Sequence, residues 1–198
     1  MKKKIVVGLV GVVVIAAVAG GFFWWENRLT PEEKWNMAKY SQPADFTVTE
    51  TAEQKIIENK TAGLTFAIPK DWTASSTEYY FKLFSADAKE KNEISMDMDN
   101  GCRIMIEIAE VNMDLNALEK EIKNSVWGKY LTEYKRNKID GRDAFQFITK
   151  SETLDFYQAG IMIPYKGKVL SVILDTVLRD SNMCLQYFEN TKNSMKIQ

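Results

Sequence analysis

Leu64-Thr65-Phe66-Ala67-Ile68-Pro69-Lys70-Asp71-Trp72 is the stretch of sequence that decides the fold. Apolar residues alternate with other residues at positions 64, 66 and 68, which is typical of a strand with one buried face. A second short strand is expected at 55–59, and Thr61-Ala62-Gly63 between the two strands predicts a hairpin. The stretch then ends in a turn at 69–72 that carries a large aromatic side chain.

Three further turn signals follow this hairpin along the chain. Asn100-Gly101 is the strongest, because both residues tolerate positive φ, and Asp140-Gly141 and Lys166-Gly167 are similar. The strands expected beside these turns are 94–99 with 102–111, 133–139 with 142–150, and 157–165 with 168–177. Additional strands are expected at 79–84 and, more weakly, around 46–48. Hairpins throughout indicate an antiparallel sheet of about six to eight strands.

Two helices complete the predicted domain. Leu115, Leu118, Ile122 and Val126 recur at steps of three and four residues, which predicts a helix over 114–127 with one apolar stripe. A last helix is expected over 181–195. A middle helix and a C-terminal helix packed on a mainly antiparallel sheet make an α+β sandwich.

The stretch from Gly63 to Trp72 is similar to the "G-f-s-f-x-x-P-x-x-W" opening of the PsbP-like fold family, which includes extracytoplasmic bacterial domains. The order of the elements that follow also resembles this family, and the resemblance covers about 55–197. It implies an α+β fold without a shared catalytic site. It also implies a protein that binds partners or assembles with them.

The N-terminus carries an uncharged run of 21 residues at 5–25. As a helix it is about 31 Å long, enough to cross the hydrocarbon core of a bilayer, so we expect a transmembrane anchor. The lysines within 1–4 predict a cytoplasmic basic tail and an extracytoplasmic remainder. Ala17-Val18-Ala19 resembles a cleavage site, so a removable signal peptide stays open. The aromatics at 22–25 favour the anchor.

Between the anchor and the domain, 26–54 is expected to form a juxtamembrane helix and a linker. Thr30 can cap a helix that has Pro31 at its first position and Glu33 completing a capping box. This helix is expected to reach about Tyr40. The predicted α+β domain then occupies 55–198.

Composition excludes several classes of function. The chain has 26 basic and 27 acidic residues. Without the three lysines of the tail the count is 23 against 27, a net charge of about −4, which is unsuited to nucleic acid. The chain has no histidine, which removes Ser–His and Cys–His nucleophiles and most zinc sites. We therefore expect no enzyme, no metal and no cofactor. The alternative is an envelope hydrolase with paired carboxylates, which only spatial proximity could reveal.

Two sets of residues are candidates for a functional or structural role. Cys102 and Cys184 can pair in an oxidising exterior, or remain as two separate buried thiols. Lys70, Trp72, Tyr79 and Tyr80 are the expected partner or ligand surface. The predicted function is that of a single-pass cell-membrane protein whose extracytoplasmic domain engages an envelope or membrane protein.

Overall fold

A computed structural model describes residues 29–77, 80–91 and 97–198, and the chain divides into two compact units, 1–37 and 38–198. In the first unit, α2 (Pro31–Asn36) begins at the predicted N-cap, where the Thr30 N–H donates to Glu33 Oε2 at 2.7 Å. The helix ends earlier than expected. The predicted anchor at 5–25 lies outside the described residues. No described helix has the length and apolar character that a membrane span requires.

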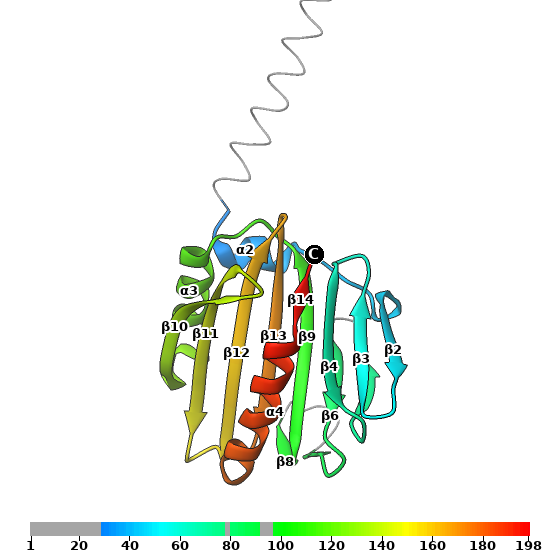
Figure 1. The fold of residues 1–198 in the computed structure, drawn as a ribbon. Coiled ribbons are helices and arrows are strands. Elements are labelled where there is room, and N and C mark those ends of the chain that lie inside the picture. The colour runs from blue at the N-terminus through cyan, green and yellow to red at the C-terminus, as the bar shows by residue number, and fades with distance from the viewer. Residues whose placement is uncertain (1–28, 78–79, 92–96) are drawn as a thin grey trace, which may run out of the picture. The chain divides into compact units, whose positions relative to one another are not determined.

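The second unit is built around an eight-stranded antiparallel sheet, in agreement with the prediction of six to eight strands (Figure 1). Its order is β10-β11-β12-β13-β9-β6-β5, and the short β1 pairs with the C-terminal end of β9. The strands are β1 (Lys39–Tyr40), β5 (Thr73–Ser76), β6 (Phe81–Phe84), β9 (Cys102–Glu110), β10 (Leu131–Ile139), β11 (Arg142–Ser151), β12 (Phe156–Tyr165) and β13 (Lys168–Thr176).

The remaining strands form two smaller sheets that the sequence did not predict as separate. A four-stranded sheet has the order β14-β4-β3-β2, and β7 pairs with β8. These strands are β2 (Phe46–Glu50), β3 (Gln54–Asn59), β4 (Leu64–Pro69), β7 (Lys89–Glu90), β8 (Met98–Asn100) and β14 (Lys196–Ile197). The helices of this unit are α3 (Leu115–Asn124), α4 (Ser181–Ser194) and the short 3-10 helices η1 (Pro43–Asp45), η2 (Gly128–Tyr130) and η3 (Leu178–Asp180).

The hydrophobic core lies on one face of the large sheet, which we call the first face. On β9 this face carries Cys102, Ile104, Ile106 and Ile108, all buried. The four-stranded sheet and α4 cover it, and α4 contacts β4, β12 and β13 (Figure 1). The core is therefore closed by a mixed layer of one helix and four strands.

Local turn chemistry predicted most of the hairpins. Asp140-Gly141 and Lys166-Gly167 have positive φ at both residues and join β10 to β11 and β12 to β13. The hairpin expected at Asn100-Gly101 is wrong, because β8 pairs with β7 and not with β9. Both sides of β9 are already taken along this part, by β13 and by β6.

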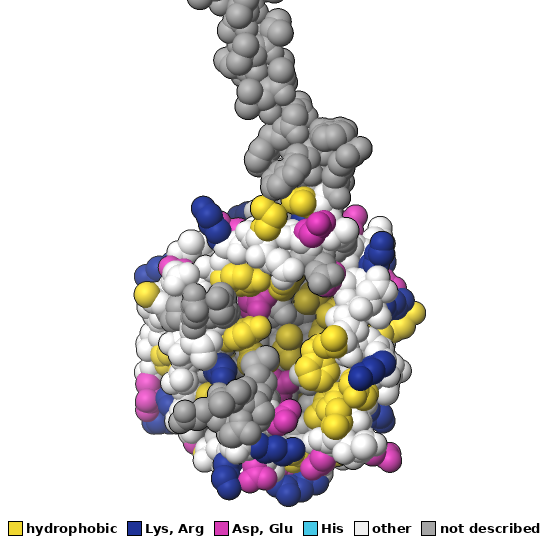
Figure 2. Space-filling model, turned by 180° about the vertical axis from the view of Figure 1, so that it is seen from behind, with side chains coloured by type: hydrophobic (Ala, Val, Ile, Leu, Met, Phe, Trp, Pro, Cys, Tyr) yellow, Lys and Arg dark blue, Asp and Glu magenta, His cyan; other side chains and the backbone are white. Residues whose placement is uncertain are grey.

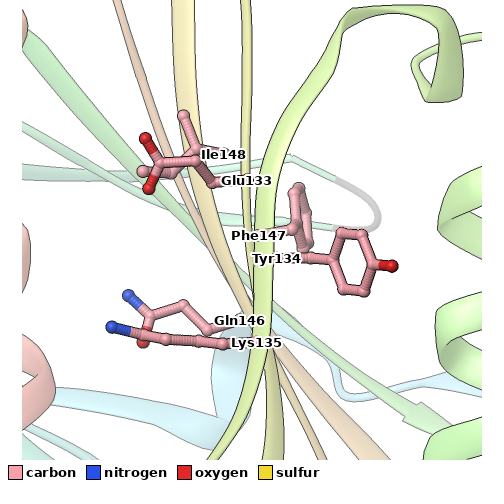
Figure 3. Close-up of a pocket in the computed structure, with 6 residues that line it drawn as sticks. All are labelled: Glu133, Tyr134, Lys135, Gln146, Phe147 and Ile148. Atoms are coloured by element: carbon pink, nitrogen blue, oxygen red, sulfur yellow. The ribbon is translucent and has the colours of Figure 1, made fainter.

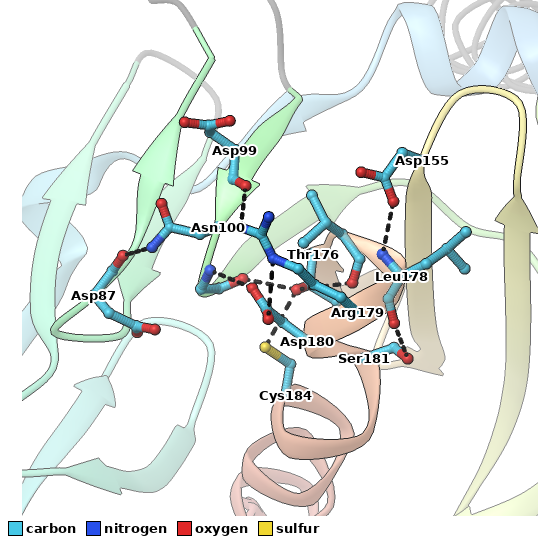
Figure 4. Close-up of polar contacts among 12 residues, drawn as sticks. Asp87, Asp99, Asn100, Asp155, Thr176, Leu178, Arg179, Asp180, Ser181 and Cys184 are labelled. Carbon is cyan, nitrogen blue, oxygen red and sulfur yellow. Dashed lines mark hydrogen bonds and ion pairs between the residues drawn. The ribbon is translucent and has the colours of Figure 1, made fainter.

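The turn at Asn100-Gly101 is instead fixed to the beginning of α4 (Figure 4). Asp180 Oδ2 accepts from the Gly101 N–H at 2.9 Å, and Thr176 Oγ1 donates to the Gly101 carbonyl at 2.7 Å. Next to this turn, Cys102 and Cys184 form a disulfide with their Cα atoms 5.4 Å apart. The start of β9 is thereby joined covalently to α4.

Candidate functional site

The face of the large sheet opposite the core, which we call the second face, carries an unusual set of polar side chains. Side chains alternate along a strand, so Arg103, Met105 and Glu107 point away from the first face. All three are nevertheless buried. Helix α3 covers part of this face, because Arg136 and Tyr134 of β10 contact its side chains Glu119 and Lys123.

A chain of hydrogen bonds crosses four neighbouring strands at one end of the second face. Thr149 Oγ1 donates to Gln158 Oε1 at 3.0 Å, and Gln158 Nε2 donates to Asp175 Oδ1 at 2.6 Å. Arg103 Nη2 donates to Asp175 Oδ2 at 3.0 Å, and its Nη1 pairs with Glu90 of β7. We call these five residues the polar ladder.

The buried Asp175 carboxyl has all its partners within the polar ladder. Burial raises the pKa of the Asp175 carboxyl. The charge of Arg103 and the hydrogen bonds from Gln158 and Arg103 lower this pKa in part. Both carboxylate oxygens of Asp175 accept hydrogen bonds. Buried charges that are paired and fully hydrogen-bonded are typical of structural networks. We therefore assign the ladder to the architecture of this face.

Glu107 differs from the ladder residues. Its side chain is 8% exposed, and burial raises the pKa of its carboxyl to about 7, while a hydrogen bond from Tyr80 lowers it in part. Burial and the proximity of Glu107 also raise the pKa of Tyr80 to about 12. Among the described residues, Glu107 Oε1 has no hydrogen-bond partner. The carboxyl group is thus buried and only half satisfied.

Space-filling shows a hollow in this face, with apolar and acidic side chains at its floor (Figure 2). The register places Ser171 of β13 opposite Glu107, with Met162 of β12 as the next residue across. The neighbouring row contains Met105 and Ile173, and Ile173 is partly exposed. By register these five residues, Glu107, Ser171, Met162, Met105 and Ile173, lie next to one another on this face, and we call them the second-face hollow.

The structure does not bring together the three predicted surface residues that it describes, Lys70, Trp72 and Tyr80. Trp72 was expected on the surface but is 1% exposed, because it packs edge-on against Tyr187 of α4 with ring centroids 5.4 Å apart. Lys70 is exposed and pairs with Glu50 at 3.5 Å. Tyr80 lies on the second face beside Glu107. Tyr79 lies outside the described residues.

A second feature is an exposed group of apolar side chains after α3. The predicted helix over 114–127 ends at Asn124, because Ser125 is extended and its Oγ accepts from the Trp127 N–H at 3.2 Å. Val126, expected on the buried stripe, is therefore 75% exposed. Trp127 packs against Phe156 with ring centroids 5.5 Å apart. We define the aromatic patch as Val126, Trp127, Tyr130, Leu154 and Phe156.

Two other depressions carry no distinct chemistry. A crevice of about 70 Å³ between β10 and β11 is lined by residues of both sheet faces, with Tyr134 and Phe147 on one side and Lys135 and Gln146 on the other (Figure 3). A wider one of about 680 Å³ at the turn ends of these strands contains several cations. Each of these cations has a partner within the chain. Arg142 Nη2, for example, donates a hydrogen bond to the Ile197 carbonyl at 2.9 Å.

Glu107 and Asp175, the two most buried acids described on the second face, are too far apart to act as a catalytic pair. Glu107 is in register with Ser171, and Asp175 with Arg103, so the two acids are offset by four residues along adjacent strands. This offset is about 13 Å along the strands, whereas glycosidase carboxylates lie about 5 to 9.5 Å apart. Within the described parts of the chain, no group of three or more acidic or cysteine side chains is placed to hold a metal ion.

No protein-family model and no curated protein matches the sequence. Among solved structures, cyanobacterial PsbP (CyanoP) from Synechocystis sp. PCC 6803 is similar with a TM-score of 0.56 and 12% identity, covering 76% of this chain and 95% of that chain. LpqN of Mycobacterium tuberculosis, described as involved in cell envelope biogenesis, gives a TM-score of 0.48 and 14% identity, covering 86% and 98%. The likeness to CyanoP establishes the PsbP-like fold, and the fold alone.

Proposed function

We propose that this chain, which has the PsbP-like fold, is a non-enzymatic binding or assembly protein that works outside the cytoplasm. In this proposal the segment 5–25 holds it at the membrane, and its domain engages an envelope or membrane protein. Anchoring would confine the domain to a thin layer and raise its effective concentration for such a partner.

The aromatic patch is the observation that carries the proposal. Trp127 is 41% exposed, its chain neighbour Val126 is 75% exposed, and Leu154, in the turn before Phe156, is 50% exposed. Clustered exposed apolar side chains are typical of protein interaction sites, and tryptophan is enriched among the residues that dominate binding energy. The ring contacts with Phe156 and Tyr130 hold Trp127 in place, so less freedom is lost on binding.

The second face supports binding over catalysis. The sequence lacks histidine, and the register separates Glu107 from Asp175 by more than a two-carboxylate mechanism allows. Asp175 is also fully engaged in the polar ladder. No observation favours the hydrolase alternative over the binding protein.

Site-specific photo-crosslinking in intact cells tests the proposal. A photoreactive phenylalanine analogue at position 127 of the full-length chain should capture a discrete membrane or envelope protein, identified by mass spectrometry. The matched control places the same analogue at Val48, an exposed residue of β2 in the four-stranded sheet, and should not capture that protein. Equal capture from both positions, or none from position 127, would contradict the proposal.

A further inference from the structure

The second-face hollow holds a buried acidic group that the described residues leave incompletely satisfied. Glu107 accepts one hydrogen bond, from Tyr80, and its Oε1 accepts none among the described residues. None of the ion pairs within the described residues includes Glu107. An unpaired buried carboxylate oxygen carries a large desolvation cost unless a partner is supplied. Among the described residues, no donor fills this position.

The charges around the hollow indicate which kind of donor fits. Arg103 already lies between Asp175 and Glu90, and Lys82 pairs with Glu90 at 3.3 Å. The nearby cations are thus committed to other acids, while Glu107 is left without one among the described residues. A ligand cation would complete the charge balance and supply a charge-assisted hydrogen bond.

The rest of the hollow suits an apolar body. Met105 and Ile173 lie in the row next to Glu107, and Met162 lies in the row of Glu107 beyond Ser171. Methionine side chains adapt to irregular shapes. Gly160, next to Ile173 in the register, has no side chain, and the Phe147 ring occupies that space. Successive rows on one face are about 7 Å apart, so a short alkyl group spans the floor.

We propose that the second-face hollow binds a small amphiphilic amine, whose ammonium group donates to Glu107 Oε1 and whose apolar part lies over Met105, Met162 and Ile173. This ligand site uses residues other than the aromatic patch. An experiment on this ligand site therefore tests it separately from the proposed protein partner.

Three probes of equal chain length isolate the head group: hexylamine, hexanol and hexanoate. Full-length protein in nanodiscs, labelled with ¹³C at the methionine methyl groups, reports binding through Met105 and Met162. Met195, buried in the first-face core, serves as the internal control. Hexylamine should shift the two hollow methyls at concentrations about ten-fold or more below those needed with hexanol. Hexanoate should leave both methyls unshifted.

Glu107→Gln should reduce the affinity for hexylamine to that for hexanol, while Glu53→Gln, an exposed acid between β2 and β3, should leave it unchanged. Hexylamine binding to the unaltered chain should also tighten from pH 5.5 to pH 8, as Glu107 ionises with its pKa of about 7. Other charged or titratable groups near Glu107 are Tyr40 of β1, Tyr80, Lys82 of β6, Arg103 of β9 and Asp175 of β13. The pH dependence must therefore disappear in Glu107→Gln.

The pH series on the unaltered chain keeps the proposal testable even where the variant does not fold. Equal binding of hexanol and hexylamine, preference for hexanoate, unchanged affinity in Glu107→Gln, or no methyl shift with any probe would each overturn the proposal.

Discussion

Glu107 is a carboxyl group placed where a strand buries both of its faces. Burial raises its pKa to about 7, above the usual value for glutamate in an unfolded chain, about 4.3. The folded state therefore binds the proton more tightly than the unfolded state between these two values. By linkage, the stabilisation that this proton provides is fully present below about pH 4 and is lost as the pH rises through 7.

Glu107→Gln should consequently be more stable than the unaltered chain at pH 8, by up to about 3 kcal/mol, because the amide carries no charge to bury. Gln still offers an oxygen to the Tyr80 hydroxyl. The difference should shrink toward pH 4, where the native carboxyl is neutral. Denaturant unfolding of both proteins at pH 4, 6 and 8 measures it. A difference that is constant over this range would show that Glu107 does not titrate as stated.

At the scale of elements, the joint between β9 and α4 combines a covalent and a polar connection. The disulfide closes a sequence separation of 82 residues, and Asp180 and Thr176 hold the adjacent Gly101 backbone. Gly101 has a φ of +74°, and an added Cβ would lie 2.6 Å from the Ala88 Cα. The turn therefore requires glycine on both conformational and steric grounds.

Replacing both cysteines, Cys102→Ala with Cys184→Ala, should lower the free energy of unfolding by up to roughly 4 kcal/mol, because the unfolded chain regains the freedom that a long closed loop removes. Dithiothreitol should destabilise the unaltered protein and leave the double variant unaffected. Denaturant unfolding with and without the reductant provides the comparison. Alkylation of both cysteines in unreduced, denatured protein, detected by mass, would show that the bond is absent.

Elements were predictable from sequence where their information is local. The turn at Asp140-Gly141 carries its own φ preference, and Asp114 caps α3 by accepting from the Ala117 N–H at 2.8 Å. The separate four-stranded sheet was not predictable in this way, since β14 joins β4 across more than a hundred residues. The alternation of side chains along β9 predicts that Glu107 points away from the core. Its neighbours, however, follow only from the pairing of β9 with β6 and β13.

For the whole molecule, the α+β fold class and the main antiparallel sheet could be predicted from the sequence, because several hairpin signals and one apolar helix stripe occur along the chain. The surface was harder to foresee. The sequence shows only that Trp72 is a large aromatic residue that follows a strand. Its burial depends on packing against α4, which the sequence pattern does not reveal. Val126 fits the apolar spacing of a helix that in fact ends two residues before it. Burial and exposure at such positions are set by tertiary contacts that periodicity does not contain.

The last prediction concerns membrane topology, that is, the side of the membrane on which the domain lies. The 21 uncharged residues at 5–25 are long enough to span a bilayer, and the lysines of 1–4 favour a cytoplasmic N-terminus. A C-terminal alkaline phosphatase fusion should therefore be active, and a C-terminal green fluorescent protein fusion exported by the same route should be dark. The full-length chain should stay in the membrane fraction after carbonate extraction, and deletion of 2–25 should release it to the soluble fraction with the phosphatase inactive. A soluble mature chain that begins at Gly20 would instead identify the segment as a removed signal peptide, and an inactive phosphatase on the full-length chain would place the domain in the cytoplasm.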